Sequence, residues 1–269
     1  MKKKMITLAI LCILLMLCII YLNTKQETIE VNLAIGMNIP NNKKIEWGLR
    51  RGKDHNQPTL DIENRKSLEK YNGIAMGNKE KKVVYLTFDN GYEAGYTEKI
   101  LEVLKENNVK ACFFLTGHYI NSAQDLVKRM IEEGHIIGNH TINHDSMPEL
   151  PDEKLKQEIM GLHNTVNDKF GYEMKYIRPP KGEYSERTLD TSKKLGYITV
   201  MWSFAYDDWE EAKQGRKDYG KTKILDNIHP GEIMLLHATS KDNSEILDDC
   251  IKEIKNMGYE FKRLDEFEP

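Results

Sequence analysis

From Lys82 to its end, the chain alternates between two hydrophobic patterns. Short runs of branched and aromatic residues, typical of buried strands, are separated by longer segments with helical periodicity. Repeated strand–helix units with short connections predict a parallel α/β fold, and the number of units favours a barrel. The predicted strands cover residues 83–88, 111–115, 135–138, 176–178, 197–202, 232–236 and 259–264, and the predicted helices cover residues 97–107, 124–133, 152–170, 186–195, 218–228 and 244–257.

The first 80 residues follow other patterns. An uncharged apolar run of eighteen residues, 5–22, follows three lysines and is nearly long enough to span a bilayer. No small-residue cleavage site ends the run, so we expect an uncleaved transmembrane anchor with the folded part outside the cytoplasm. A cleaved signal and secretion are the alternative. Residues 23–80 are polar and weakly periodic, which indicates a stalk that either packs on the barrel or hangs as a tether.

Composition adds little to this picture. A chain of 269 residues with 40% apolar residues, 30% charged residues and a net charge of −3 is long enough for a full core and gives no sign of nucleic-acid binding. Four cysteines are too few for a disulfide framework at this length. Cys12 and Cys18 lie in the apolar run, and we expect Cys112 and Cys250 to be free thiols rather than a disulfide.

Chemically useful side chains follow the predicted strands, at the ends where barrel loops converge on an active site. His140 and His144 are about one helical turn apart, so both imidazoles could face one divalent ion. Taken singly, each such residue has a structural explanation, such as a turn cap, a surface ion pair or a core histidine. Their joint position indicates an enzyme. The remaining members of the set are Asp89, Arg178, Asp208 and His237.

Five ordered motifs extend this set, and with them the chain resembles the polysaccharide deacetylase family, with its NodB homology domain and carbohydrate esterase family 4 chemistry. The resemblance runs from about Lys82 to Glu266. It implies a distorted (β/α) barrel that removes acetyl groups from glycans with a divalent metal. The motifs are Thr87–Gly91, His140–His144, Arg178–Gly182, Asp208–Trp209 and Leu235–His237.

Further segments are most similar to the sporulation branch of the family, whose members deacetylate N-acetylmuramic acid on the route to muramic δ-lactam in spore cortex peptidoglycan. That resemblance implies a hydrolase of linear amides acting on a peptidoglycan glycan strand, facing the forespore intermembrane space, without an obligate protein partner. The alternatives are a deacetylase of N-acetylglucosamine polymers or another glycan, or a non-catalytic cell-wall glycan-binding protein. The segments are Asp89–Glu93, Trp202–Tyr206, Ile228–Gly231 and Ala238–Asn243.

The expected domains are therefore an anchor or signal segment at 1–22, a polar stalk or N-terminal extension at 23–80 and a catalytic domain at 81–269.

Amide hydrolysis suggests a role for each polar residue. Asp89 can take a proton from the attacking water as general base, and His237 can protonate the leaving amine. Asp208 can orient His237, and Arg178 can keep Asp89 ionised. The resemblance implies the same four catalytic roles.

The resemblance also implies contacts with the substrate. It places the backbone N–H of Lys181 at the oxyanion, and Trp209 and Leu236 around the acetyl methyl group. We further expect Tyr184 to border the groove, and the Lys181 side chain to recognise the lactyl carboxylate that distinguishes muramic acid from glucosamine.

Asn90 departs from the family pattern, because most relatives have there an aspartate that completes an Asp-His-His metal triad. A neutral amide is a poorer ligand than a carboxylate. We therefore expect His140 and His144, weakly assisted by Asn90, to hold zinc, or alternatively cobalt, manganese or magnesium, less tightly than relatives with the aspartate.

Overall fold

The computed structural model describes residues 13–26 and 40–269, and the chain divides into two compact units, Met1–Asn41 and Asn42–Pro269. In the first unit, residues 13–26 form a helix with exposed side chains. Across the described residues, no helix is both long enough and apolar enough to cross a membrane. Part of the expected anchor, residues 1–12, lies outside the described residues, and the anchor as a whole lacks structural support.

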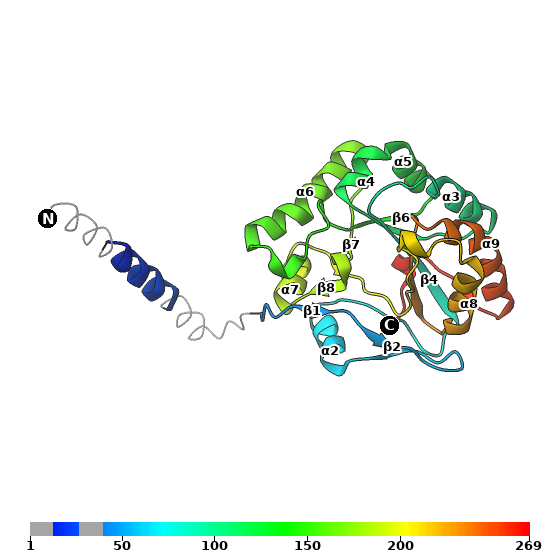
Figure 1. The fold of residues 1–269 in the computed structure, drawn as a ribbon, viewed down its shortest axis with the longest axis horizontal. Helices are drawn as coiled ribbons and strands as arrows, with labels where there is room; N and C mark the ends of the chain where they lie inside the picture. Colours follow the sequence, from blue (N-terminus) through cyan, green and yellow to red (C-terminus); the bar gives the residue numbers. More distant parts are fainter. Residues whose placement is uncertain (1–12, 27–39) are drawn as a thin grey trace. The chain divides into compact units, whose positions relative to one another are not determined.

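The second unit is built on one parallel sheet of seven strands in the order β10–β4–β5–β6–β7–β9, with β11 also paired to β4 (Figure 1). Every residue of β4 is buried, as expected for a central strand covered on both faces. An isolated bridge between Phe204 and Met234 links the chain after β9 to β10. The sheet is thus an incompletely closed parallel half-barrel. Its strands are β4 (Val83–Asn90), β5 (Cys112–Leu115), β6 (Ile136–Asn139), β7 (Tyr176–Ile177), β9 (Ile198–Thr199), β10 (Glu232–His237) and β11 (Glu260–Phe261).

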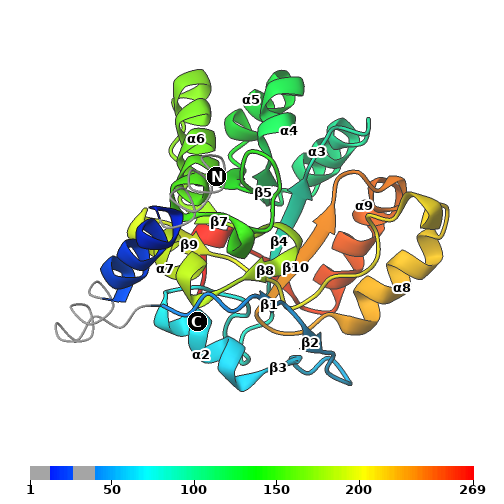
Figure 2. The same cartoon turned by 60° about the vertical axis from the view of Figure 1, so that its left-hand side comes forward.

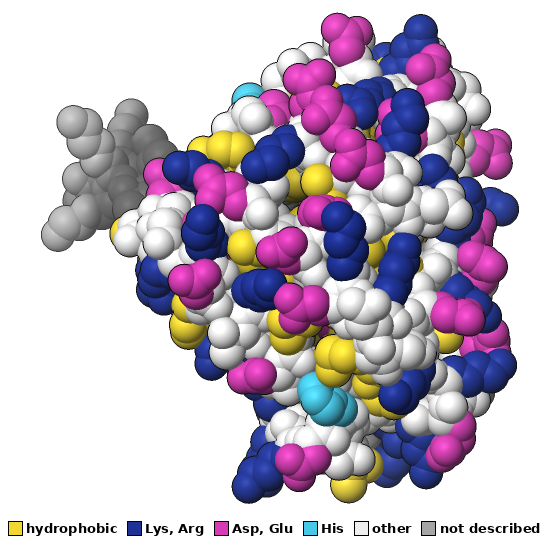
Figure 3. Space-filling view, turned by 90° about the vertical axis from the view of Figure 1, so that its right-hand side faces the viewer, with side chains coloured by type: hydrophobic (Ala, Val, Ile, Leu, Met, Phe, Trp, Pro, Cys, Tyr) yellow, Lys and Arg dark blue, Asp and Glu magenta, His cyan; other side chains and the backbone are white. Residues whose placement is uncertain are grey.

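Helices surround the sheet in Figure 1 and bury their apolar faces in one large core cluster. Ser185 begins α7 with a capping box, and Gly171 ends α6 in the left-handed conformation at φ 63°. On the face in Figure 3, acidic and basic side chains are interspersed. The helices are α3 (Thr97–Glu106), α4 (Gly117–Ser122), α5 (Gln124–Glu132), α6 (Asp152–Phe170), α7 (Glu186–Lys194), α8 (Lys217–Asn227) and α9 (Lys241–Asn256), with short 3-10 turns η1 (Met147–Glu149), η2 (Pro180–Gly182), η3 (Glu211–Lys213) and η4 (Leu264–Glu266).

Residues 42–80, the N-terminal segment, pack on the half-barrel. Strand β1 (Ile45–Glu46) pairs antiparallel with β8 (Glu183–Tyr184), and β2 (Leu49–Arg50) pairs with β3 (Thr59–Leu60), next to α2 (Ile62–Lys70) (Figure 2). A separate apolar cluster joins α2 to α7 and the loop after β9. The sequence left open whether the stalk packs on the barrel or hangs as a tether, and the structure shows that residues 42–80 pack on it. The range 81–269 for a catalytic domain stays a prediction. The shared cluster contains Leu68, Tyr71, Tyr184, Leu189 and Met201.

Cys112 and Cys250 are buried free thiols, as expected. Burial raises the pKa of Cys250 to about 12, so this thiol is not poised for reaction.

Candidate active site

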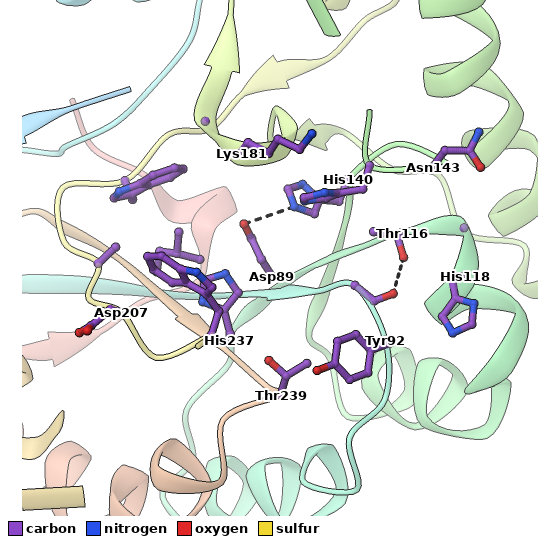
Figure 4. Close-up of a pocket in the computed structure, with 18 of the residues that line it drawn as sticks. Asp89, Tyr92, Thr116, His118, His140, Asn143, Lys181, Asp207, His237 and Thr239 are labelled. Atoms are coloured by element: carbon purple, nitrogen blue, oxygen red, sulfur yellow. Dashed lines mark hydrogen bonds and ion pairs between the residues drawn. The ribbon is translucent and has the colours of Figure 1, made fainter. Parts of the chain in front are cut away.

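An open cavity of about 1520 Å³ lies at the carboxyl ends of the strands. Asp89 and His237 reach it from the ends of β4 and β10, which lie side by side with these two residues in register. His140 enters from the loop after β6, and Lys181 enters from η2 (Figure 4). His144, from the same loop as His140, also lines the cavity. The parallel sheet therefore brings together residues that are far apart in the sequence.

Asp89 is held as a carboxylate. The Arg178 guanidinium, wholly buried, donates from Nη1 to Asp89 Oδ1 at 2.8 Å and from Nε to the Val200 carbonyl at 3.1 Å. Burial alone would raise the pKa of Asp89, but the positive charge of Arg178, assisted by His140 and His237, brings it below its usual value. An ionised carboxylate at the cavity wall can accept a proton from water.

His237 is paired with a carboxylate, which raises its pKa, whereas the positive partner of Asp89 lowers the pKa of that residue. Its Nδ1 lies 2.8 Å from Asp208 Oδ1, while its backbone N–H and the Asn243 amide donate to Asp208 Oδ2 at 2.7 and 2.6 Å. Burial lowers the pKa of His237, but Asp208 outweighs it, and the net shift is upward. Because Nδ1 is engaged by Asp208, Nε2 is the nitrogen available to the cavity. The pair is suited to hold and deliver a proton.

His140 and His144 converge, but not as one turn of a helix. The residues between them form a loop with positive φ at Thr141 (64°) and at His144 (60°), so the expected helical face is wrong. The two rings still come together, with centroids 4.8 Å apart. His140 Nδ1 lies 2.8 Å from the Arg178 carbonyl, which orients the ring and leaves Nε2 towards Asp89 Oδ2 at 3.4 Å.

These imidazoles have the properties of metal ligands. Burial lowers the pKa of both, that of His144 to about 4, so both are neutral with free lone pairs near neutral pH. The bond from His140 Nδ1 to a carbonyl is the typical support of a ligating histidine. Within the described ranges, however, no group of three or more His, Cys, Asp or Glu side chains is arranged to hold a metal. The two imidazoles fit a divalent ion, but no acidic side chain among the residues that the structure describes completes a three-ligand group with them.

Asn90 does not supply that ligand in this structure. Its side chain is wholly buried, is not part of the cavity lining, and neither amide atom has a hydrogen-bond partner within residues 13–26 and 40–269. It lies near the Tyr119 hydroxyl, which donates to Glu93 at 2.9 Å. Adjacent strand residues point to opposite sides, so with Asp89 in the cavity Asn90 faces inward.

The loop that carries Lys181 is tightly constrained. Lys181 has φ 59° and Gly182 has φ 68°, both in the left-handed region. A Cβ at Gly182 would lie 2.8 Å from the Trp202 ring and 3.1 Å from Trp47 Cβ, so only glycine fits between the two tryptophans. Trp209, half-exposed, lines the cavity with its ring 5.4 Å from that of His237.

Two expected substrate contacts are misplaced. Tyr184 is wholly buried in the cluster beneath the N-terminal segment, and Leu236 lies in the main core. On β10 the residue beside His237 on the cavity face is Leu235, because side chains alternate along a strand.

The structure adds cavity residues that the sequence analysis did not select. Among them are Arg51, Tyr92, Asn143, Trp202, Asp207 and Thr239. Four of these six lie inside the motifs and segments named above and one lies beside a motif, but Arg51 lies in none of them.

Comparisons with known proteins agree with this geometry. Residues 76–200 match the family model described as polysaccharide deacetylase. The chain is 42% identical to the peptidoglycan-N-acetylmuramic acid deacetylase PdaA of Bacillus subtilis, over 84% of this chain and 86% of that protein. The solved structure of PdaA, described as a family 4 carbohydrate esterase, superimposes with a TM-score of 0.82 over 84% of this chain and 97% of that one.

Two other relatives are less similar to this chain than PdaA, the first by TM-score and the second by sequence identity. A family 4 carbohydrate esterase structure from Bacillus anthracis is 43% identical, with a TM-score of 0.72, over 85% of this chain and 97% of that one. A peptidoglycan-N-acetylglucosamine deacetylase of Bacillus cereus is 35% identical over 73% of this chain and 72% of that protein.

Proposed function

This chain belongs to the polysaccharide deacetylase family, and we propose that it hydrolyses the acetamide of N-acetylmuramic acid residues in peptidoglycan, on the route to muramic δ-lactam. One observation carries the proposal of amide hydrolysis: Asp89, paired with Arg178, and His237, paired with Asp208, open into one cavity beside two neutral imidazoles. The higher identity to a muramic acid deacetylase than to a glucosamine deacetylase supports the substrate.

The residues divide the reaction between them. Asp89 accepts a proton from the water that adds to the acetyl carbonyl carbon, and the Lys181 N–H donates to the oxyanion. As the C–N bond breaks, His237 delivers a proton to the departing amine, and acetate leaves. A divalent ion held by His140 and His144, zinc first and cobalt, manganese or magnesium as alternatives, would polarise the carbonyl and acidify the water.

Substrate choice follows from charge. Peptide-free muramic acid carries a free lactyl carboxylate beside the acetamide, and the exposed Lys181 side chain lies close enough to His144 to contribute to its lowered pKa. A cation so near the reacting group favours muramic acid over glucosamine. Lys181→Ala should reduce activity on muramic acid strands more than on chitin oligomers, and equal losses would overturn this assignment.

We further propose that the enzyme works outside the cytoplasm, held in the membrane by residues 1–22 or secreted after their cleavage, on cortex glycan in a spore former. The basis is the lysine-flanked apolar run of residues 5–22.

Acetate release from peptide-free peptidoglycan strands, with and without a chelator, tests the function. We expect release that the chelator abolishes and added zinc restores. Release from chitin oligomers alone would favour the glucosamine alternative. Binding of strands without release under any metal would favour a non-catalytic glycan-binding protein.

A further inference from the structure

We propose that Arg51 is a specificity-determining residue that binds a lactyl carboxylate of the glycan strand, on the muramic acid two sugars from the reacting one. Arg51 lines the cavity, although it lies in the N-terminal segment, directly after β2. The inference rests on the proposed function, which it deepens by naming a second anion-recognition point.

The N-terminal segment is fixed to two loops that line the cavity. The Trp47 backbone N–H donates to the Gly182 carbonyl at 2.9 Å, beside Lys181, and its indole N–H donates to the Trp202 carbonyl at 2.9 Å. Strand β1 pairs with β8 just after that loop. The backbone that leads to Arg51 is therefore held to the cavity loops by the contacts of Trp47 and β1.

The Arg51 guanidinium is held against the loop after β9. Its Nη2 donates to the Ala205 carbonyl at 3.0 Å, and its Cζ lies 5.9 Å from the centroid of the Phe204 ring. Within the described part of the chain, these contacts use one of the five N–H donors of the guanidinium and leave the rest available. The group is thus positioned on the wall while most of its hydrogen-bonding capacity is unused.

Its charge is also unused. Among the described residues, no carboxylate forms an ion pair with Arg51, whereas nearby Asp207 is occupied by Lys213 at 2.7 Å and Arg216 at 3.3 Å. An oriented guanidinium without an acidic partner, on the wall of an open cavity, suits a carboxylate ligand.

The chemistry of the strand decides which carboxylate this is. Muramic acid alternates with glucosamine, so a peptide-free strand presents lactyl carboxylates at every second sugar. Lys181 and His144 line the same cavity, and Lys181 is the cation assigned above to the reacting ring, whereas Arg51 contacts the loop after β9 at Ala205. Two cations on different segments of the cavity lining match two carboxylates on one strand.

Binding of the full chain to peptide-free strands tests the inference, with the dissociation constant followed by tryptophan fluorescence. The probe strands are native or have their carboxylates converted to neutral methylamides. Arg51→Ala should raise Kd for native strands about fivefold, the scale of a solvent-exposed ion pair, and leave Kd for neutralised strands unchanged. Arg51→Lys should recover part of the loss.

Arg50 is the matched control. It is the exposed neighbour on β2, carries the same charge and does not line the cavity. Arg50→Ala should leave both constants unchanged. Equal effects of the two substitutions, or an equal effect of Arg51→Ala on native and neutralised strands, would overturn the inference. Acetate release, measured separately, decides the proposed function, so the two failures are distinguishable.

Discussion

The reaction centre and the N-terminal segment border the same cavity but are built in different ways. In the reaction centre, side chains from adjacent parallel strands are held by buried ion pairs, as between Asp89 and Arg178. In the N-terminal segment, the backbone and indole N–H groups of Trp47 donate hydrogen bonds to the loops at Gly182 and Trp202, which are both far from Trp47 in the sequence. The comparison suggests a division: substitutions in the first region should change catalytic rate and proton transfer, and substitutions in the second should change binding and stability.

The largest expected effect is at Asp89. Asp89→Asn keeps the shape of the side chain but removes the proton acceptor, so kcat for acetate release should fall about a thousandfold. The Arg178 charge also loses its buried partner, so the melting temperature has to be measured on the same sample. A folded variant that keeps more than a tenth of wild-type kcat would contradict the role of Asp89. It would also contradict the expectation that substitutions in the reaction centre change the catalytic rate.

Asp208→Asn should alter the pH dependence of the rate. Asp208 raises the pKa of His237 against the opposing effect of burial, and the protonated ring is the form that donates to the amine. Activity should therefore fall as pH rises through the pKa of His237. Without the carboxylate that pKa drops, so the alkaline limb moves to lower pH and kcat near neutrality falls about a hundredfold.

The pH–rate profile from pH 5 to 9 measures this limb directly. An unmoved alkaline limb in Asp208→Asn would assign the proton to another group. Trp47→Phe is the control from the second region, and it should leave the limb in place.

Much of this first region could be predicted from sequence, because buried strands have a strong local pattern and the carboxyl ends of parallel strands share one face. The rule that these ends share one face was enough to place Asp89 and His237 in the candidate site. Leu236 was misassigned because strand register was not applied, since residues two apart share a face and Leu235 thus accompanies His237.

The second region could not be predicted in this way. Trp47 and Arg51 make contacts with loops more than a hundred residues away, as in the bonds to Trp202 and Ala205, and no local periodicity encodes them. The positive φ angles between His140 and His144 also left no signal in the sequence, since neither Thr141 nor His144 is glycine.

A smaller effect, on metal affinity rather than rate, is expected from Asn90→Asp. A new carboxylate in the buried position of Asn90 would lie near Tyr119 and its partner Glu93, and the positive charge of a divalent ion at the two imidazoles would help to offset its burial. Zinc affinity, measured by calorimetry, should rise on the order of tenfold. An unchanged or weaker affinity would refute the view that the missing carboxylate limits metal binding.

The smallest effect belongs to the second region. Trp47→Phe removes the indole N–H bond to the Trp202 carbonyl but keeps the backbone bond to Gly182, so unfolding should become easier by about 1 kcal/mol. With one wall loosened, KM for peptide-free strands should rise a few fold while kcat changes little, because Asp89 and His237 are held by other partners. Thermal unfolding and steady-state acetate release measure both quantities. A loss confined to kcat would mean that the N-terminal segment positions the reacting groups themselves, and the proposed division between the two regions would fail.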